Sequence, residues 1–171
     1  MGEYEGCTFN NCNFYISSIA GCLFIDCSFN SCDLSMVKLS ETLLRDIHFK
    51  NCKMLGLLFD SCNQFGLSVG FENCTLNHSS FYKTNIKKTV FNNTVLQEVD
   101  FTGSNLTGAV FNNCNLLNAR FENTILEKVD FRTSFNYTID PELNKIKKAK
   151  FSLSGLPGLL NKYDIDIDYR G

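Results

Sequence analysis

The residues with the clearest potential for chemistry are nine cysteines, which are accompanied by only two histidines. Cysteines at suitable spacing form disulfides or, together with histidine, bind zinc. Here the cysteine count is odd, no two cysteines form a Cys-x-x-Cys pair, and the two histidines, His48 and His78, occupy outward repeat positions. We therefore predict neither a disulfide framework nor a metal site.

The cysteines share one position relative to their neighbours, because each lies two residues before a large apolar residue, except Cys62, which lies two residues before Gln64. They are Cys7, Cys12, Cys22, Cys27, Cys32, Cys52, Cys62, Cys74 and Cys114. Ser17, Val37 and Ala109 occupy the same kind of position, so it requires a small side chain and not sulfur. We predict that the thiols are reduced, point inward and act as small apolar groups. Unpaired cysteines are typical of a reducing compartment, so we expect a cytoplasmic protein.

The elements that position these thiols follow from a period of five in the large apolar residues. The first run is Phe9, Phe14, Ile19, Phe24, Phe29, Leu34, Leu39, Leu44, Phe49, Met54 and Phe59, and a second run extends from Phe71 to Phe131. A helix has a period of 3.6 and a flat strand a period of 2, so neither gives this pattern. A short repeat of fixed length predicts a solenoid whose stacked units bury a shared core.

Four pentads would close one turn of twenty residues, with parallel pairing of adjacent coils at about 4.8 Å. One column would then contain only phenylalanines: Phe9, Phe29, Phe49, Phe71, Phe91, Phe111 and Phe131. The step from Phe49 to Phe71 is 22 residues. We therefore predict a two-residue bulge at a corner between Gln64 and Gly70, and we place it near Leu67 and Ser68. The Gln64 side chain should turn outward or hydrogen-bond the bulged backbone.

The chain has 171 residues and a formal net charge of −2. It contains no apolar run of about 18 residues, and its first residues lack the basic and apolar regions of a signal peptide. It also contains no phosphate-binding loop, dinucleotide fingerprint or nucleophile elbow. We therefore predict a protein without catalytic residues, cofactor, small-molecule substrate or membrane span.

The period stops after Phe131. Four lysines within residues 145–150 precede Phe151 and indicate a last partial coil. Ser154 is a plausible N-cap for a short helix, and residues 164–169 alternate like a short strand. An apolar stripe marks this segment: Leu153, Leu156, Leu159, Leu160 and Tyr163. We predict a β-helix over residues 1–133 and a cap over residues 134–171 that joins two chains in a homodimer through this stripe.

The repeat resembles that of the pentapeptide-repeat family, in which a small residue and Asp or Asn precede a large apolar centre. Asn105-Leu106, Asn115-Leu116 and Asp130-Phe131 match this motif. The resemblance implies an all-β, right-handed quadrilateral β-helix. The layout is also similar to the bacterial Qnr and topoisomerase-poison immunity subgroup, which implies a dimeric rod that binds a type II topoisomerase such as DNA gyrase by mimicking duplex DNA. The alternative is a scaffold with an unrelated protein partner.

The surface charge supports DNA mimicry only in part. Residues 1–131 contain 13 acidic and 9 basic residues, a net charge of −4. Duplex DNA over a rod of about 30 Å carries about 18 charges. The lysines are few in an acidic chain, so we expect no direct nucleic-acid binding. A second candidate partner surface is a stack of outward apolar residues in the first half, namely Tyr15, Ile16, Met36 and Leu55.

Overall fold

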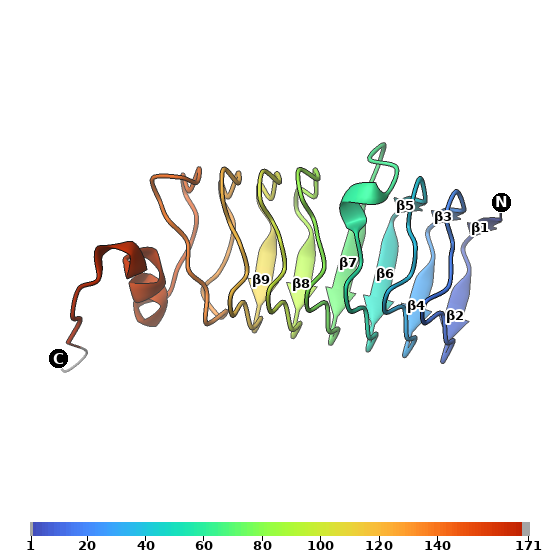
Figure 1. Cartoon of the computed structure of the whole chain (residues 1–171), viewed down its shortest axis with the longest axis horizontal. Helices are drawn as coiled ribbons and strands as arrows, with labels where there is room; N and C mark the ends of the chain where they lie inside the picture. Colours follow the sequence, from blue (N-terminus) through green and yellow to red (C-terminus); the bar gives the residue numbers. More distant parts are fainter. Residues whose placement is uncertain (1, 169–171) are drawn as a thin grey trace.

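The chain forms a rod of stacked coils, shown from the side in Figure 1. The structure is a computed structural model, and it describes residues 2–168. All its strands pair in parallel. One sheet contains β1 (Glu3–Glu5), β3 (Leu23–Ile25) and β5 (Leu43–Arg45). The other contains β2 (Thr8–Asn10), β4 (Ser28–Asn30), β6 (Ile47–Lys50), β7 (Val69–Glu72), β8 (Val90–Asn92) and β9 (Val110–Asn112).

Four sides can be distinguished in each coil. The β2 sheet forms the first side, and isolated bridges such as Asn13 to Asp33 and Ser18 to Lys38 hold the next two. The fourth side begins with β1, β3 and β5 and continues through bridges that join Asn105 to Asn85 and to Ile125. Within each side, residues twenty apart pair with each other. The predicted solenoid of four-sided coils is confirmed.

Two columns of phenylalanine rings fill most of the interior. On the first side the rings stack in parallel, with centroids 4.7 Å apart for Phe91 and Phe111. This column also includes Phe151, whose ring is 5.5 Å from that of Phe131, so the coils continue past residue 133. The opposite column begins at Phe59. Rings of the two columns meet edge to face, as Phe91 and Phe101 do at 6.0 Å and 84°.

The small inward residues donate hydrogen bonds to the coil before them. Thr124 Oγ1 lies 2.9 Å from the carbonyl oxygen of Phe101, and Cys52 Sγ lies 3.2 Å from that of Phe29. In both cases the acceptor is the apolar centre 23 residues earlier. All nine cysteines are free thiols. Cys7, Cys12 and Cys22 are only half-buried, because no described residue covers the end of the rod formed by the first coil.

The 22-residue step lies between Asn63, which pairs with Leu43, and Val69, which pairs with Ile47. The extra residues do not bulge at Leu67 and Ser68, where we expected them. Leu67 is buried, and the Ser68 backbone bonds to the coil before it. The chain instead leaves the coil at residues 64–66, because Gly66 adopts a φ of 74° and Gln64 Nε2 donates to two backbone carbonyls of residues 59–62. A short 3-10 helix, η1 (Phe59–Ser61), precedes this loop (Figure 1).

The last coil is covered by two 3-10 helices, η2 (Leu153–Leu159) and η3 (Asn161–Tyr163). The N-cap of η2 is Ser152, whose Oγ accepts a hydrogen bond from the Gly155 N–H at 3.2 Å, and not Ser154 as expected. Residues 164–168 form no strand, because no described segment lies beside them to pair with. The expected strand also included Tyr169, which lies outside the described residues. No helix within residues 2–168 is long and apolar enough to cross a membrane.

Candidate interaction surfaces

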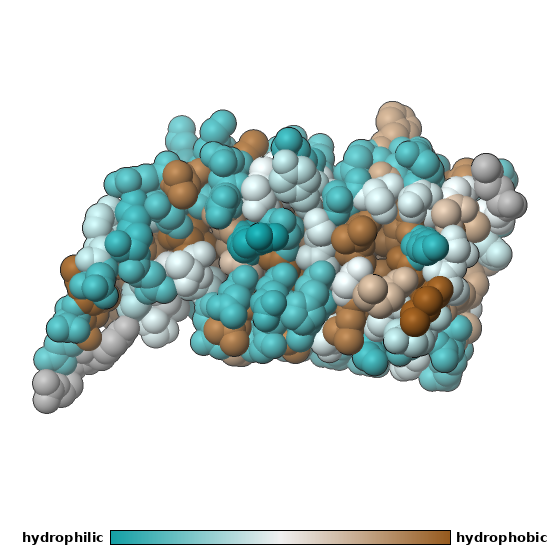
Figure 2. Space-filling model, viewed as in Figure 1, coloured by the Kyte–Doolittle hydropathy of each residue, from teal (hydrophilic) through white to brown (hydrophobic). Residues whose placement is uncertain are grey.

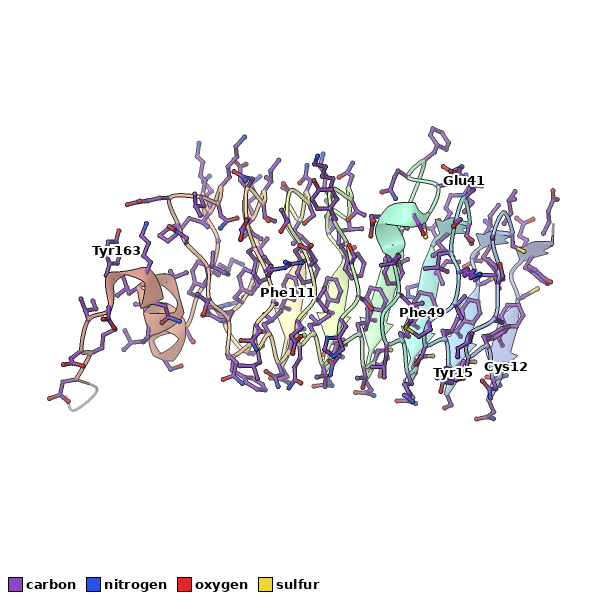
Figure 3. All side chains as sticks on the ribbon, in the orientation of Figure 1. Cys12, Tyr15, Glu41, Phe49, Phe111 and Tyr163 are labelled. Carbon is purple, nitrogen blue, oxygen red and sulfur yellow. The ribbon has the colours of Figure 1, made fainter. Side chains whose placement is uncertain are left out.

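An exposed apolar patch lies on the outside of the first coils. We call it the apolar corner patch, and it consists of Tyr15, Ile16, Met36 and Leu55. The side chains of Tyr15, Ile16 and Met36 are 54%, 61% and 55% exposed, and Leu55 is half-buried. The structure therefore brings the four predicted residues together. Figure 2 shows apolar side chains gathered on this part of the rod, and Figure 3 places Tyr15 on its outside.

The backbone of this patch is strained. Ile16 and Met36 have φ values of 57° and 58°, in the left-handed region that disfavours residues with bulky side chains. The next coil carries Gly56 at this corner, and the Met36 sulfur lies over it, 2.6 Å from where a Cβ would stand. Further coils place polar residues there, beginning with His78 and Glu98. An exposed isoleucine at a corner where Asn or Gly would be relaxed is a reason to look for a function.

The apolar stripe of the cap is partly buried and partly exposed. Leu159 packs against the core, and Leu160 is half-buried. Leu153, Leu156 and Tyr163 are 85%, 40% and 50% exposed. The Tyr163 hydroxyl donates to Glu142 Oε1 at 3.1 Å, which fixes the end of the cap to the last coil. The cap therefore leaves an apolar surface of its own.

The loop at residues 64–66, which we call the insertion loop, carries an exposed aromatic residue that we did not predict from the sequence. Phe65 is 79% exposed, and its N–H donates to Asn63 Oδ1 at 2.9 Å. The only signal in the sequence was its position next to the 22-residue step. Because we assigned the extra residues to Leu67 and Ser68, Phe65 was not considered as a surface residue.

Burial keeps two of the thiols inside the coils in their neutral form. Burial raises the pKa of the Cys62 thiol to about 12 and that of Cys114 to about 11. These two side chains are therefore uncharged near neutral pH and are poor nucleophiles. Within residues 2–168, no three histidine, cysteine or acidic side chains are grouped so that they could hold a metal ion.

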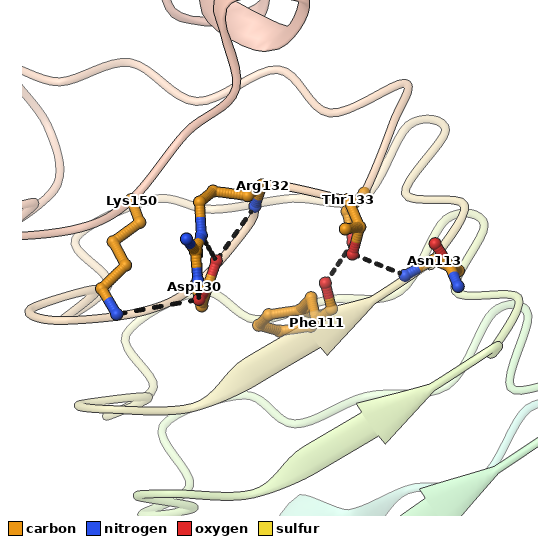
Figure 4. Close-up of polar contacts among 7 residues, drawn as sticks. Phe111, Asn113, Asp130, Arg132, Thr133 and Lys150 are labelled. Atoms are coloured by element: carbon orange, nitrogen blue, oxygen red, sulfur yellow. Dashed lines mark hydrogen bonds and ion pairs between the residues drawn. The ribbon is translucent and has the colours of Figure 1, made fainter.

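Many basic residues of the rod are neutralised by a neighbour. Figure 4 shows one example, in which Asp130 accepts hydrogen bonds from Arg132 and lies 3.8 Å from the Lys150 ammonium. The Arg132 hydrogen bond is the main cause that lowers the pKa of the Asp130 carboxyl. Beside it, Thr133 Oγ1 accepts from the Asn113 N–H at 3.0 Å. These contacts tie adjacent coils together and leave no charged group of the cluster free.

Comparison with known proteins agrees with the repeat. A family profile described as a pentapeptide repeat region matches residues 3–64 and 67–140, and the two residues that it omits are in the insertion loop. A search of curated proteins finds no match.

A search of solved structures finds proteins that are similar to this chain. Full-length QnrB1, described as a plasmid-mediated fluoroquinolone resistance protein, is 21% identical with a TM-score of 0.49, over 95% of this chain and 90% of that one. A trypsin-treated form of QnrB1 has 20% identity and a TM-score of 0.48, over 97% and 91% of the two chains. HetL, a pentapeptide repeat protein involved in heterocyst differentiation regulation from a Nostoc cyanobacterium, has 9% identity and a TM-score of 0.33, over 91% and 89%.

Proposed function

Since the chain belongs to the pentapeptide-repeat family, we propose that it is a non-enzymatic protein-interaction module. The apolar corner patch carries this proposal. Exposed apolar residues that stand singly are ordinary, but a stacked group of them is a candidate protein contact. The left-handed φ of Ile16 supports the same conclusion, because the asparagine used at this corner in a later coil would fold with less strain.

The finer proposal is that the partner is a type II topoisomerase such as DNA gyrase, met in the cytoplasm, and that the rod acts as a partial DNA mimic. The straight rod of stacked coils supports this proposal by its shape. Its charge supports it only in the first half, where acidic residues are in excess. A scaffold with an unrelated protein partner remains the second candidate, since fold alone does not determine function.

We also propose that residues 134–171 act as a cap and dimerisation segment. Leu153 and Leu156 are exposed apolar residues of η2, and Tyr163 is an exposed aromatic residue of η3. A two-fold contact would use this one surface twice, which makes a second copy the simplest partner. Sedimentation of the protein at micromolar concentration tests this. We expect a dimer for the full chain, and a monomer with its cap intact would contradict it.

A gyrase supercoiling assay with a quinolone tests the finer proposal. We expect the protein to restore supercoiling, and the double variant Ile16→Asn and Met36→Asn to lose this effect. His78→Asn is the matched control, because it changes the same corner column in a later coil. No restoration by the unmodified protein would exclude gyrase and favour the unrelated partner. Restoration by the double variant would move the contact away from the apolar corner patch.

A further inference from the structure

Charges on the fourth side of the rod are separated by sign. We call this side the bipolar side; it begins with β1, β3 and β5 and includes the corners before and after each of its strands. Before the insertion it carries five acidic residues and one basic residue, Arg45, a net charge of −4. The acidic residues are Glu3, Glu5, Asp26, Glu41 and Asp46. After the insertion it carries seven lysines and one acidic residue, Glu127, a net charge of +6. The lysines are Lys83, Lys87, Lys88, Lys128, Lys145, Lys147 and Lys148.

The charges of the bipolar side are not neutralised within the chain. None of these residues takes part in an ion pair with another residue of the described range 2–168. Elsewhere the pattern differs, since Lys50 pairs with Glu72 at 3.0 Å and Arg120 with Asp100 at 2.8 Å. The insertion loop with exposed Phe65 marks the boundary between the two halves, at the upper edge of the rod in Figure 1.

The coil register fixes the order of these residues along the rod. Gly6, Asp26 and Asp46 share one corner, and Lys88, Gly108, Lys128 and Lys148 continue it after the insertion. Within the strands, Glu3 pairs with Leu23, and Ile125 pairs with Lys145. The acidic and basic residues therefore occupy the same positions of the coil. The acidic residues lie in the coils before the insertion, and the lysines lie in the coils after it.

We propose that the bipolar side binds the same side of a second copy of this chain, antiparallel and face to face, about a two-fold axis between the insertion loop and the Lys88 coil. In this register the first coil of one copy faces the last coil of the other. Glu3 then faces Lys145, Glu5 faces Lys147, and Asp26 faces Lys128. Each pair forms twice, because a two-fold contact is self-complementary.

The insertion loop protrudes from the rod on this side (Figure 1), so in this register each loop lies against the Lys87 coil of the other copy. Leu23, which is half-buried, faces half-buried Ile125. Phe65 faces Lys87, whose ammonium can lie over an aromatic ring. Asp46 and Glu41 face the corners at Gly108 and Gly103, which carry no side chain. No two groups of like charge oppose each other. Exposed ion pairs each contribute little, so the contact is weak and depends on salt.

Cross-linking with a zero-length carbodiimide, which joins a carboxylate to an amine in direct contact, tests the proposal on the full chain. Asp26 and Lys128 lie five coils apart in one chain, about 24 Å, and so cannot be joined within it. We expect cross-linked peptides joining Asp26 to Lys128 and Glu5 to Lys147. Their yield should fall about tenfold when salt rises from about 0.1 M to about 1 M, because the screening length shortens from about 10 Å to about 3 Å.

Charge reversal supplies the control. Asp26→Lys alone and Lys128→Asp alone should each reduce the Glu5–Lys147 cross-link, and the double variant should restore it. Both residues are exposed corner residues at positive φ, and both residue types already occupy this corner, so the fold should persist and circular dichroism checks it. Cross-links confined to neighbouring coils, or a double variant as weak as the single ones, would overturn the proposal. Binding of heparin to the lysine half without cross-links between copies would also overturn it, in favour of a polyanionic partner.

Discussion

The two halves of the rod share one backbone repeat but differ in what fills and covers it. After the insertion, Phe81, Phe91, Phe101 and Phe111 are fully buried and alternate between two opposite columns. Before the insertion, smaller residues such as Ile19 and Leu39 face the phenylalanine column. A cavity of about 10 Å³ remains there among aliphatic and aromatic side chains. The later half therefore has the more regular core.

The surfaces of the two halves differ as well, and here the first half carries the more distinctive residues. The first half carries the apolar corner patch and the acidic half of the bipolar side. The later half is mostly polar, and its corners are occupied by residues such as Lys88, Gly108 and Asn118. The apolar corner residues with a left-handed φ, Ile16 and Met36, therefore lie in the first half, which has the less regular core. From this comparison we expect the later half to contribute more of the stability, and the first half to present the recognition surface that we propose above.

The largest expected effect comes from removing a ring in the later half. Phe91→Ala should lower the free energy of unfolding by about 3–5 kcal/mol, because the ring is fully buried between its neighbours and its removal leaves a cavity. Phe9→Ala is the matched change in the first coil, where the ring is only half-buried, and should cost less. Urea denaturation followed by circular dichroism measures both. Equal costs would show that the two halves do not differ in core stability.

Much of this architecture follows from sequence because the repeat is local and the same twenty-residue step applies to every side. Phe49 and Phe71 could be placed together across the insertion by counting alone, and they pair in the structure. The loop itself could not be predicted in detail. Leu67 and Phe65 are both large and apolar, and only the φ of Gly66 and the hydrogen bonds of Gln64 decide which one is buried.

The cap and the surfaces were predicted less well. Both Ser152 and Ser154 are able to cap η2, and the choice depends on how the chain leaves Phe151. A periodic pattern identifies outward positions, which is how Tyr15 and Met36 were found. It does not show which charged residues lack a partner, because that depends on the neighbouring coil. The separation of charge on the bipolar side was therefore visible only in the structure.

A smaller difference is expected between hydroxyl and thiol groups at the small inward positions. Ser134 Oγ donates to the Phe111 carbonyl at 2.7 Å and accepts from the Cys114 N–H at 3.2 Å. Ser134→Ala leaves both backbone groups without these partners and should cost about 1–3 kcal/mol. The Cys32 thiol makes only weak contacts, at 3.4 Å from the carbonyl oxygens of Phe9 and Asn30. Cys32→Ala should therefore cost less than about 1 kcal/mol. Similar costs in urea denaturation would show that the hydroxyl bonds do not matter.

Ile16→Asn separates recognition from stability in the first half. Asparagine tolerates the left-handed conformation better than isoleucine, so the free energy of unfolding should stay unchanged or rise by up to about 1 kcal/mol. Binding to the partner should fall at the same time, since the side chain is exposed and apolar. Thermal unfolding and a binding assay on the same sample measure the two effects. A variant that loses stability would show that Ile16 serves the fold instead.

The effect that is smallest near neutral pH concerns the buried thiols. A thiol in the unfolded chain has a pKa of about 9, whereas burial raises the pKa of Cys62 to about 12 and that of Cys114 to about 11 in the folded protein. Above pH 9 the unfolded chain loses these protons and the folded chain retains them. Stability from these groups is therefore fully present below pH 9 and is lost as the pH rises toward 12. Urea denaturation at a series of pH values measures this loss.

Alkylation by iodoacetamide at pH 8 measures how accessible each thiol is in the folded protein. The half-buried thiols of the open first coil, Cys7, Cys12 and Cys22, should react before Cys62 and Cys114, which should react only after unfolding in urea. Labelling of Cys114 in the folded protein at the same rate as Cys7 would contradict the closed core of the later half.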